Sequence, residues 1–434
     1  MANIKINPNK ILGEFKILNA VNNGPACKRH AVDQARSNFQ SYKEANIPYA
    51  RNHDASHAAI YGGEHTVDIS AVFPDFNANP YMPDSYDFAC TDEIILIALD
   101  AGTKTFYRLG QKIEHYIKKY NIFPPADFHK WAVICEHIIR HYTKGWANGF
   151  FHDMPYWEIW NEPDLDLEDN PYKRTWTGTK VQFFDLFEIT AKHLKKCFPE
   201  LKIGGPALAG RSEWAKEFLE EMNKRSVPMD FFSWHVYCNE PSKMLDDAKL
   251  YRKLMDDNGY EKAESILNEW NYVQGWTDEF TYSIEMIHGV KGASFVTACM
   301  CAAQHSSIDM LMYYDARIGA FNGLWDFYTL KPLKGYYPFK WYGELYTLQE
   351  IEAECSDEQI YTLSGVDENG KTKTLVTYYS NDDSAPDKKI TVDFGRNGKY
   401  EVFVVDGGRT NELIPASELK FNIKVHTILM ICEK

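Results

Sequence analysis

The sequence predicts an α/β protein, a (β/α)8 TIM barrel with an appended C-terminal β-sandwich. A short apolar run followed by a longer helical stretch recurs through most of the chain, and this alternation implies parallel strands joined by crossover helices. Eight such units favour a closed barrel, although a doubly wound open sheet would produce a similar alternation. The length of 434 residues fits a barrel of roughly 250–350 residues plus a small module.

Eight apolar runs are the expected barrel strands, and stretches with helical patterning separate them. In chain order the runs are residues 15–21, 47–51, 104–109, 156–160, 202–206, 231–237, 265–270 and 310–314. The expected helices include 32–45, one that starts near Thr91 with Asp92 and Glu93 in its first turn, 128–142 and 182–197. We therefore expect a catalytic barrel in residues 11–348.

After about residue 348 the sequence changes to short strand-like runs separated by Gly, Asn and Asp turns. This pattern is typical of a β-sandwich. The expected accessory domain is 349–434, with residues 1–10 as a candidate addition and 3–14 as a weaker candidate strand. The expected strands are 360–363, 374–379, 390–394, 401–405 and 427–431.

Charge and composition exclude several classes of partner. A net charge of −14 argues against nucleic acid, because phosphate binding needs clustered Lys and Arg. No apolar run is long enough to span a bilayer, so no membrane partner is expected. The first ten residues lack the apolar core of a signal peptide, and the nine cysteines form no CxxC pair. A cytoplasmic location fits best, although a trimmed export signal would leave the same pattern; a homo-oligomer stays open.

The carboxyl ends of several predicted strands are polar, and in a barrel these ends carry the reacting groups. A buried strand that ends in a carboxylate is costly unless the carboxylate is paired or used. Two such carboxylates are what glycosidic cleavage requires, one to protonate the leaving oxygen and one to act at the anomeric carbon. The polar residues concerned are Arg51, His53, Asn161, Glu162, His235, Tyr237 and Glu269.

Each signal also has a purely structural interpretation. Asn161-Glu162-Pro163 alone could be a turn, and Glu269 could form a buried ion pair with Arg51. Glu158 lies in the same strand as Glu162 but earlier, so we interpret it as structural.

Taken together, the segments resemble one known family. Residues 157–163 resemble the acid/base segment of clan A glycoside hydrolases, particularly family 39, which contains β-xylosidases and α-L-iduronidases. Residues 267–271 resemble its nucleophile strand, with Asn268 in place of the usual Thr. Residues 230–237 resemble its sixth strand, and 21–25 and 51–54 resemble the ends of its first two. The long stretch 54–86 and the eighth-strand region 313–317 depart from the family pattern, which puts the substrate in doubt more than the chemistry.

The resemblance implies a retaining glycosidase with Glu162 as acid/base and Glu269 as nucleophile, separated by about 5–5.5 Å. Its substrate would be a terminal sugar, β-xyloside-like or a related pentoside or hexoside, on a short oligosaccharide. Arg51 is expected to keep Glu269 ionised, Tyr237 to donate a hydrogen bond to it, and Asn161 to hold the substrate's 2-hydroxyl. His53 and His235 are candidates for hydroxyl contacts, with packing as the alternative.

Near the eighth strand, Tyr313, Asp315, Arg317 and Trp325 are further candidates for the sugar site. An inward-pointing Arg317 would favour an acidic sugar, because Arg recognises carboxylates bidentately. Pairing of Arg317 with Asp315 would favour a neutral sugar.

No metal or cofactor is expected. Glu136, His137 and His141 share a predicted helix, but a solvated helix face is the preferred interpretation, and the looser cluster His53, His57 and His65 is interpreted in the same way. No Gly-rich phosphate loop opens a helix. The alternative functions are a non-catalytic carbohydrate-binding barrel and a transglycosidase or phosphorylase on the same scaffold.

Overall fold

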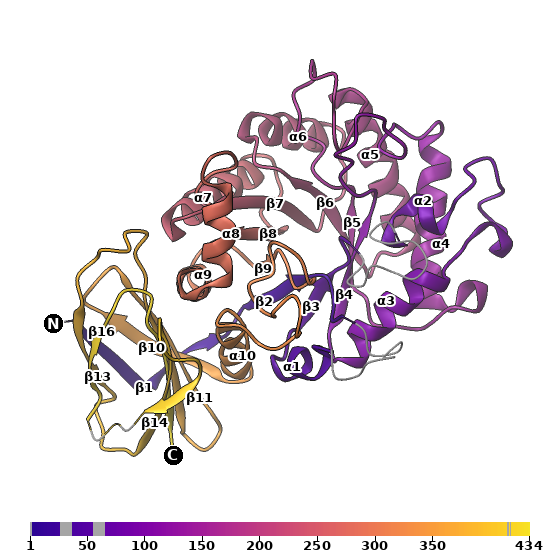
Figure 1. Ribbon diagram of the computed structural model, residues 1–434. Coiled ribbons are helices and arrows are strands. Elements are labelled where there is room, and N and C mark those ends of the chain that lie inside the picture. The colour runs from indigo at the N-terminus through magenta and orange to yellow at the C-terminus, as the bar shows by residue number, and fades with distance from the viewer. Residues whose placement is uncertain (1, 27–36, 55–65, 415, 417) are drawn as a thin grey trace.

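The computed structural model of the protein describes residues 2–26, 37–54, 66–414, 416 and 418–434. It contains a closed parallel barrel and a separate, largely antiparallel sheet (Figure 1). The barrel strands pair in chain order, and the first and last strands close the ring. The predicted fold class is therefore confirmed.

The barrel strands coincide with the eight predicted runs to within a few residues, and the described helices surround them (Figure 1). The strands are β2 (Ile17–Asn22), β3 (Tyr49–Arg51), β4 (Lys104–Leu109), β5 (Tyr156–Ile159), β6 (Lys202–Leu208), β7 (Phe231–Cys238), β8 (Glu264–Tyr272) and β9 (Met310–Tyr313). The helices are α1 (Phe39–Glu44), α2 (Ile69–Val72), η3 (Pro83–Ser85), α3 (Ala89–Asp100), α4 (Phe128–Lys144), η4 (Trp146–Asn148), α5 (Lys180–Cys197), α6 (Ser212–Lys224), α7 (Pro241–Asp257), α8 (Phe280–His288), α9 (Val290–Gln304) and α10 (Tyr336–Leu345).

Local sequence explains where the long helices begin. Asp127 accepts a hydrogen bond from the Lys130 amide at the start of α4, and Thr179 forms a capping box with Gln182 at the start of α5. The helix predicted over 32–45 is described only from Phe39, because residues 27–36 lie outside the described part of the chain.

The interior of the barrel changes character along its axis. Its amino-terminal half is filled by apolar side chains that form one cluster: Ala20, Phe106, Tyr156, Phe231, Ile266, Met310 and Met312. Towards the carboxyl ends of the strands the interior becomes polar, with Arg51, Glu158 and Glu269 all buried. The polar end therefore rests on an apolar floor, which excludes water from below.

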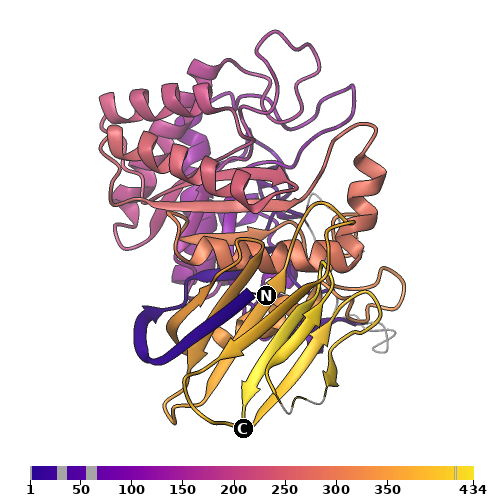
Figure 2. The same ribbon diagram turned by 90° about the vertical axis from the view of Figure 1, so that its left-hand side faces the viewer.

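The C-terminal part forms one continuous nine-stranded sheet in place of two separately bonded layers, and it curls around its own apolar core (Figure 2). The candidate strand at the N-terminus is present, and it pairs antiparallel with β10 and parallel with β13. Strands β10, β15 and β16 were not predicted. The strands are β1 (Ala2–Glu14), β10 (Gln349–Cys355), β11 (Ile360–Val366), β12 (Thr372–Tyr378), β13 (Lys388–Asp393), β14 (Tyr400–Val405), β15 (Glu412–Ile414), β16 (Lys420–Ile423) and β17 (Ile428–Glu433).

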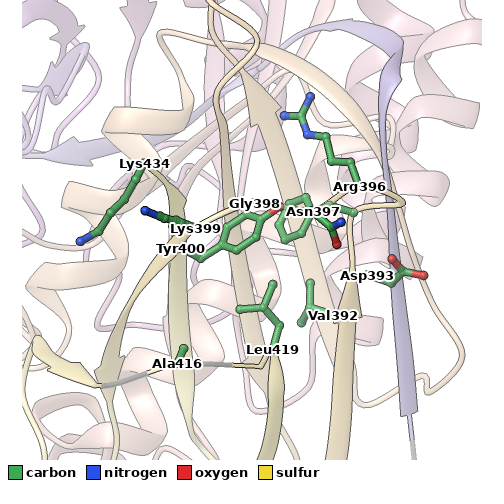
Figure 3. Close-up of a pocket in the computed structure, with 11 residues that line it drawn as sticks. Val392, Asp393, Arg396, Asn397, Gly398, Lys399, Tyr400, Ala416, Leu419 and Lys434 are labelled. Carbon is green, nitrogen blue, oxygen red and sulfur yellow. The ribbon is translucent and has the colours of Figure 1, made fainter.

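A pocket of about 520 Å³ lies in this sheet (Figure 3). The stacked rings of Phe394 and Tyr400, with centroids 4.7 Å apart, form part of its lining, and Arg396, Lys399 and Lys434 add positive charge. No residue predicted for the sugar site lines this pocket, so it is separate from the candidate chemistry.

The C-terminal part contacts the barrel through polar groups gathered around the buried Lys291 and Tyr272. The ammonium group of Lys291 on α9 donates to the Tyr282 hydroxyl (2.9 Å), the Asn381 carbonyl (2.7 Å) and the Asp383 carboxylate (2.8 Å). The Tyr272 hydroxyl, at the end of β8, lies 2.9 Å from Oδ1 of Asn381. These contacts link the sheet to the strand that carries Glu269.

Helix α9 packs between the two parts, and Cys299 and Cys301 are buried in it. Among the described helices, none is by itself long and apolar enough to cross a membrane. Only the pair α8 and α9, which is bent by 79°, satisfies that test of length and composition.

We predict that Lys291→Met lowers the free energy of unfolding by about 2 kcal/mol, because it removes charged hydrogen bonds from a buried interface. Urea denaturation would measure the change. Lys253→Met is the matched control, since it removes an exposed ion pair with Asp257 and should cost less than about 1 kcal/mol. Equal effects of the two substitutions would contradict this account of the interface.

Candidate active site

Two buried glutamates meet at the polar end of the barrel. Glu162 follows β5 and Glu269 lies in β8, and both side chains are almost fully buried. One oxygen of each carboxylate and one ring nitrogen of His235 all lie within 4.8 Å of one another. Nδ1 of His235 is 2.7 Å from Oε1 of Glu162 and 3.6 Å from Oε2 of Glu269. The structure therefore brings together the two carboxylates that the sequence singled out.

The backbone around Glu162 is strained. Trp160 and Glu162 have φ values of +73° and +49°, a region that residues with a Cβ rarely adopt. Two contacts hold Glu162 in place: its amide donates to the Ala207 carbonyl (2.8 Å), and the Thr175 hydroxyl donates to its carbonyl (2.6 Å). Such strain persists only where the surroundings impose it, and it is concentrated at functional sites.

A third carboxylate, Asp164, fixes the loop that follows Glu162. It accepts hydrogen bonds from the amides of Ala209 (2.7 Å) and Arg211 (3.1 Å), which joins the loop after β5 to the loop after β6. Burial raises the pKa of Asp164 to about 6 although these amides oppose the shift. Sequence reasoning missed this residue.

Arg51 is the cation at the centre of the site. It is fully buried, and its guanidinium group donates to Glu269 (2.8 Å), Glu158 (2.6 Å) and the Asn161 side-chain oxygen (2.7 Å). The ion pair with Glu269 that the sequence offered as a structural alternative is therefore present. It is also the contact that a nucleophile needs to stay charged.

Glu158, interpreted from the sequence as structural, lies beneath the two other glutamates. It accepts hydrogen bonds from Ser233 (2.6 Å), Asn268 and Arg51. Asn268, the departure from the usual Thr, therefore supports the carboxylate that orients Arg51. Glu158 acts on the site only through the guanidinium group.

The surroundings of Glu269 favour its ionised form. Burial alone would raise the pKa of this carboxyl, but His235, His53 and Arg51 together lower it well below its usual range. The Tyr237 hydroxyl donates a hydrogen bond to Oε2 (3.0 Å), and burial raises the pKa of Tyr237, so this hydroxyl keeps its proton. Nε2 of His53 lies 3.1 Å from Oε1.

His53 lies between two carboxylates, Asp54 and Glu269. Burial lowers its pKa, but Asp54 and Glu269 raise it by more, and the net shift is upward. Nδ1 of His53 is 3.4 Å from Asp54, whose own pKa is held far down by His53, Arg317 and Lys112 against the effect of burial.

Among the buried side-chain nitrogens of the site that have no hydrogen-bond partner in the described part of the chain, two belong to residues that contact Arg51 or Glu162. They are Nδ2 of Asn161 and Nε2 of His235, and both atoms are buried. Because an unsatisfied buried polar group is costly, such groups call for a ligand that pairs with them. Both are placed to bind a polyhydroxylated molecule beside the carboxylates.

Arg317 is balanced by neighbouring carboxylates. Its Nε lies 3.3 Å from Asp315 and its Nη1 lies 3.5 Å from Asp54. Asp315 also accepts a hydrogen bond from the Asn23 side chain (2.9 Å), and burial raises its pKa to about 7 although Arg317 opposes that shift. The pairing of Arg317 with Asp315 is the arrangement that favours a neutral ligand.

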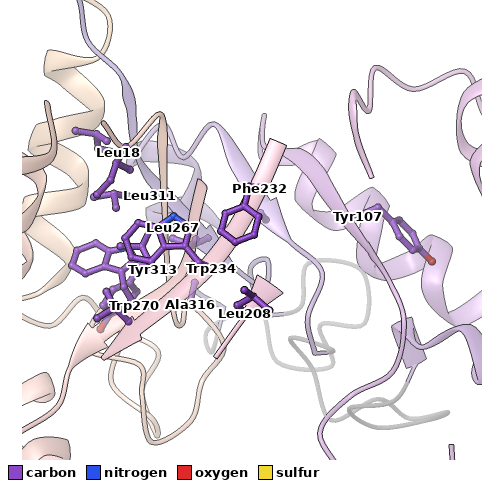
Figure 4. Close-up of a cluster of buried hydrophobic side chains, with 14 of the residues drawn as sticks. Leu18, Tyr107, Leu208, Phe232, Trp234, Leu267, Trp270, Leu311, Tyr313 and Ala316 are labelled. Carbon is purple, nitrogen blue, oxygen red and sulfur yellow. The ribbon is translucent and has the colours of Figure 1, made fainter. Parts of the chain in front are cut away.

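Tyr313 and Trp325, both predicted to line the sugar site, lie elsewhere. Tyr313 packs with Trp270 in the hydrophobic layer outside the barrel (Figure 4), and its hydroxyl donates to the Phe321 carbonyl (3.2 Å). Trp325 stacks on Tyr42 with centroids 5.6 Å apart. The structure brings neither side chain to the carboxylates.

Tyr314 takes the place that was predicted for Tyr313. Its hydroxyl donates to Asp54 (3.1 Å), and its ring lies 5.7 Å from that of His53. Successive side chains on a strand point to opposite faces, so a prediction one residue out of register selects the wrong face.

The two helical histidines considered for a metal bind different groups. His137 contacts the Val133 carbonyl (2.8 Å) and His141 contacts Asp92 (3.0 Å). Glu136 lies instead beside His193, 2.7 Å away. His57 and His65, from the second candidate cluster, are outside the described residues.

Comparisons with known proteins place the chain in a family. The family model described as Glycosyl hydrolases family 39 matches residues 4–314. A β-xylosidase of Geobacillus stearothermophilus is 26% identical over 235 residues, which cover 47% of this chain and 44% of the relative. A β-xylosidase of Caldicellulosiruptor saccharolyticus is 32% identical over 163 residues, covering 35% of this chain and 31% of the relative. The chain thus spans less than half the length of these curated relatives.

Solved structures share the whole fold at low sequence identity. A glucosidase from Croceicoccus marinus superposes with a TM-score of 0.81 at 20% identity, covering 100% of this chain and 99% of the other. A monomeric β-xylosidase from Caulobacter crescentus CB15 gives 0.70 at 15% identity and covers 99% of each chain. These likenesses support the fold of barrel plus sheet.

We predict that Arg51→Met lowers the free energy of unfolding by about 3–5 kcal/mol, because it leaves two buried carboxylates without their cation. Adding Glu158→Gln should recover part of the loss, since one buried charge is then removed. Urea denaturation of the single and double variants measures both effects.

Arg140→Met is the control for this cycle, because Arg140 forms a partly exposed pair with Glu136 worth about 1 kcal/mol or less. A double variant less stable than Arg51→Met alone would contradict the assignment of Glu158 as a counter-charge.

Proposed function

The chain belongs to the glycosyl hydrolases of family 39, and we propose that it is a retaining glycosidase that removes a terminal sugar from short oligosaccharides. One observation carries the proposal: one carboxylate oxygen of Glu162 and one of Glu269 lie within 4.8 Å of each other. Retaining enzymes place their carboxyl groups about 5–5.5 Å apart, whereas inverting enzymes leave about 6.5–9.5 Å for a water molecule.

In the first step Glu269 attacks the anomeric carbon and forms a covalent bond to it. The bond from that carbon to the leaving oxygen breaks, and Glu162 donates its proton to that oxygen. Arg51 and Tyr237 hold the attacking carboxylate from two sides. His235, with Nδ1 2.7 Å from Oε1 of Glu162, holds the orientation of this carboxyl group.

In the second step Glu162, now ionised, takes a proton from water. The oxygen of this water attacks the anomeric carbon and displaces Glu269. Two inversions at one carbon restore its original configuration. The same residue therefore serves as acid and then as base, and this exchange of roles needs both carboxylates in one enclosed site.

The free amide donor of Asn161 supports a contact with the substrate's 2-hydroxyl group. Arg51 binds the side-chain oxygen of Asn161, and this bond leaves Nδ2 available for the sugar. Hydrogen bonds to this hydroxyl strengthen as charge develops at the anomeric carbon, so the contact stabilises the transition state.

For the terminal sugar we propose a neutral β-linked pentose or hexose, xylose first. The names of the two curated relatives, both β-xylosidases, favour xylose, and the glucosidase among the structural neighbours makes glucose the next choice. The pairing of Arg317 with Asp315 and Asp54 supports a neutral sugar, because the guanidinium charge is already balanced.

The test is hydrolysis of nitrophenyl β-xyloside, α-L-arabinofuranoside, β-glucoside, β-galactoside and α-L-iduronide by the wild type and by Glu162→Gln and Glu269→Gln. We expect release from at least one glycoside and a loss of at least about 10³-fold in kcat for Glu269→Gln, because no covalent intermediate forms. Glu264→Gln is the control, since Glu264 lies at the opposite end of β8 and pairs with Lys202.

The configuration of the first product, followed by proton NMR, tests retention. Release that survives in both glutamine variants would reject the catalytic pair. An inverted first product would reject the covalent mechanism.

We predict that His53→Gln moves the acid limb of the pH profile of kcat/KM to higher pH by about one unit. The nucleophile must be ionised, and His53 helps to keep the pKa of Glu269 low, so loss of its charge raises that pKa. His305→Gln is the control, because His305 is exposed and pairs with Glu350 away from the site. An acid limb that stays in place or moves to lower pH would contradict this role.

A further inference from the structure

Trp276 lies on the loop between β8 and α8, and its side chain is 58% exposed. Among the tryptophans that the structure describes, it alone is exposed. Because Phe280 and Phe321 lie beside it, this ring belongs to an aromatic group at the surface, and apolar groups of this kind, unlike singly exposed residues, mark binding surfaces.

The ring of Trp276 is one aromatic contact away from the nucleophile. Its centroid lies 5.1 Å from that of Tyr237, and the Tyr237 hydroxyl donates to Glu269. Phe280, at 5.9 Å and nearly parallel, and Phe321, at 6.2 Å, complete the aromatic group around it.

Hydrogen bonds fix the start of the loop that carries the ring. The Val273 amide donates to the Cys238 carbonyl (3.0 Å), and the Gln274 amide donates to the Ser283 hydroxyl on α8 (2.9 Å). A ring that is already held in place loses little conformational entropy when a ligand binds against it.

The two sides of the barrel's carboxyl end carry different kinds of side chains. On the side of β3 and β9 lie the buried carboxylates Asp54 and Asp315 and the partly buried Arg317, which suit the hydroxyl groups of an enclosed terminal sugar. Glu162, Tyr237 and Trp276 come from the arc that runs from β5 to β8. The leaving group must lie on this arc, because Glu162 has to protonate its oxygen.

We propose that Trp276 forms a subsite for the leaving group and stacks its ring against the apolar C–H face of the second sugar. This inference rests on the proposed function. The exposed ring, its position beside Tyr237 and its place on the side of Glu162 point to the same part of the substrate. Trp276 is thus a binding residue that selects substrates by what is attached to the terminal sugar.

The test compares Trp276→Ala with the wild type on two substrates that share a terminal sugar, xylobiose and β-xylosyl fluoride, with cellobiose and β-glucosyl fluoride as the second pair. Fluoride is too small to reach the ring. We expect the loss of kcat/KM on the disaccharide to exceed the loss on the fluoride by about tenfold. Trp276→Phe should recover most of that difference.

Phe151→Ala is the matched control, because Phe151 is also exposed but precedes β5, at the opposite end of the barrel. Equal losses on both substrates, or no loss on either, would overturn the subsite. In either outcome, hydrolysis of the fluoride by the wild type would still support the proposed function. A wild type inactive on both pairs would overturn the function and the subsite together.

Discussion

The site depends on one buried guanidinium group. Arg51 forms ion pairs with two buried carboxylates, Glu158 and Glu269, and these contacts offset part of the cost of burying the three groups. Its Nη2 atom donates to Asn161, the residue before Glu162, so one side chain holds Glu269 directly and the backbone neighbour of Glu162 as well. Ser233 and Asn268 donate hydrogen bonds to Glu158 and so hold the carboxylate that binds this cation. The apolar floor of the barrel then keeps water from weakening these interactions.

Much of this arrangement can be predicted from the sequence. Strands that are buried on both faces appear as apolar runs, and the polar residues at their ends can be identified by contrast. The positions of Glu162 and Glu269 follow from that contrast. Where a run is apolar on both faces, as in the last barrel strand, the sequence does not show which side chains point into the barrel. For this reason the prediction fell on Tyr313 and not on Tyr314. The sequence predicted a structural role for Glu158. Its contact with Arg51 could not be predicted, because it depends on packing between strands that are distant in the chain.

The accessory sheet was harder to predict than the barrel. Strand β10 carries alternating charged residues, and β15 and β16 are short, so none of them forms a clear apolar run. The stretch that includes residues 55–65, the departure from the family pattern that most concerns the substrate, is not fully described by the structure. Trp276 gave no signal in the sequence, because only the fold shows that it is exposed and beside Tyr237.

The position of β1 has a consequence for synthesis of the chain. This strand is synthesised before the barrel, yet both of its partners, β10 and β13, are made only after the whole barrel. Until then its edges are unpaired, and unpaired edges favour association with other chains. Pairing of β1 with β10 and β13 therefore follows assembly of the barrel. Because these segments are far apart in the chain, this pairing is a late and slow step of folding. The sheet that braces the strand of Glu269 is thus among the last parts of the molecule to form.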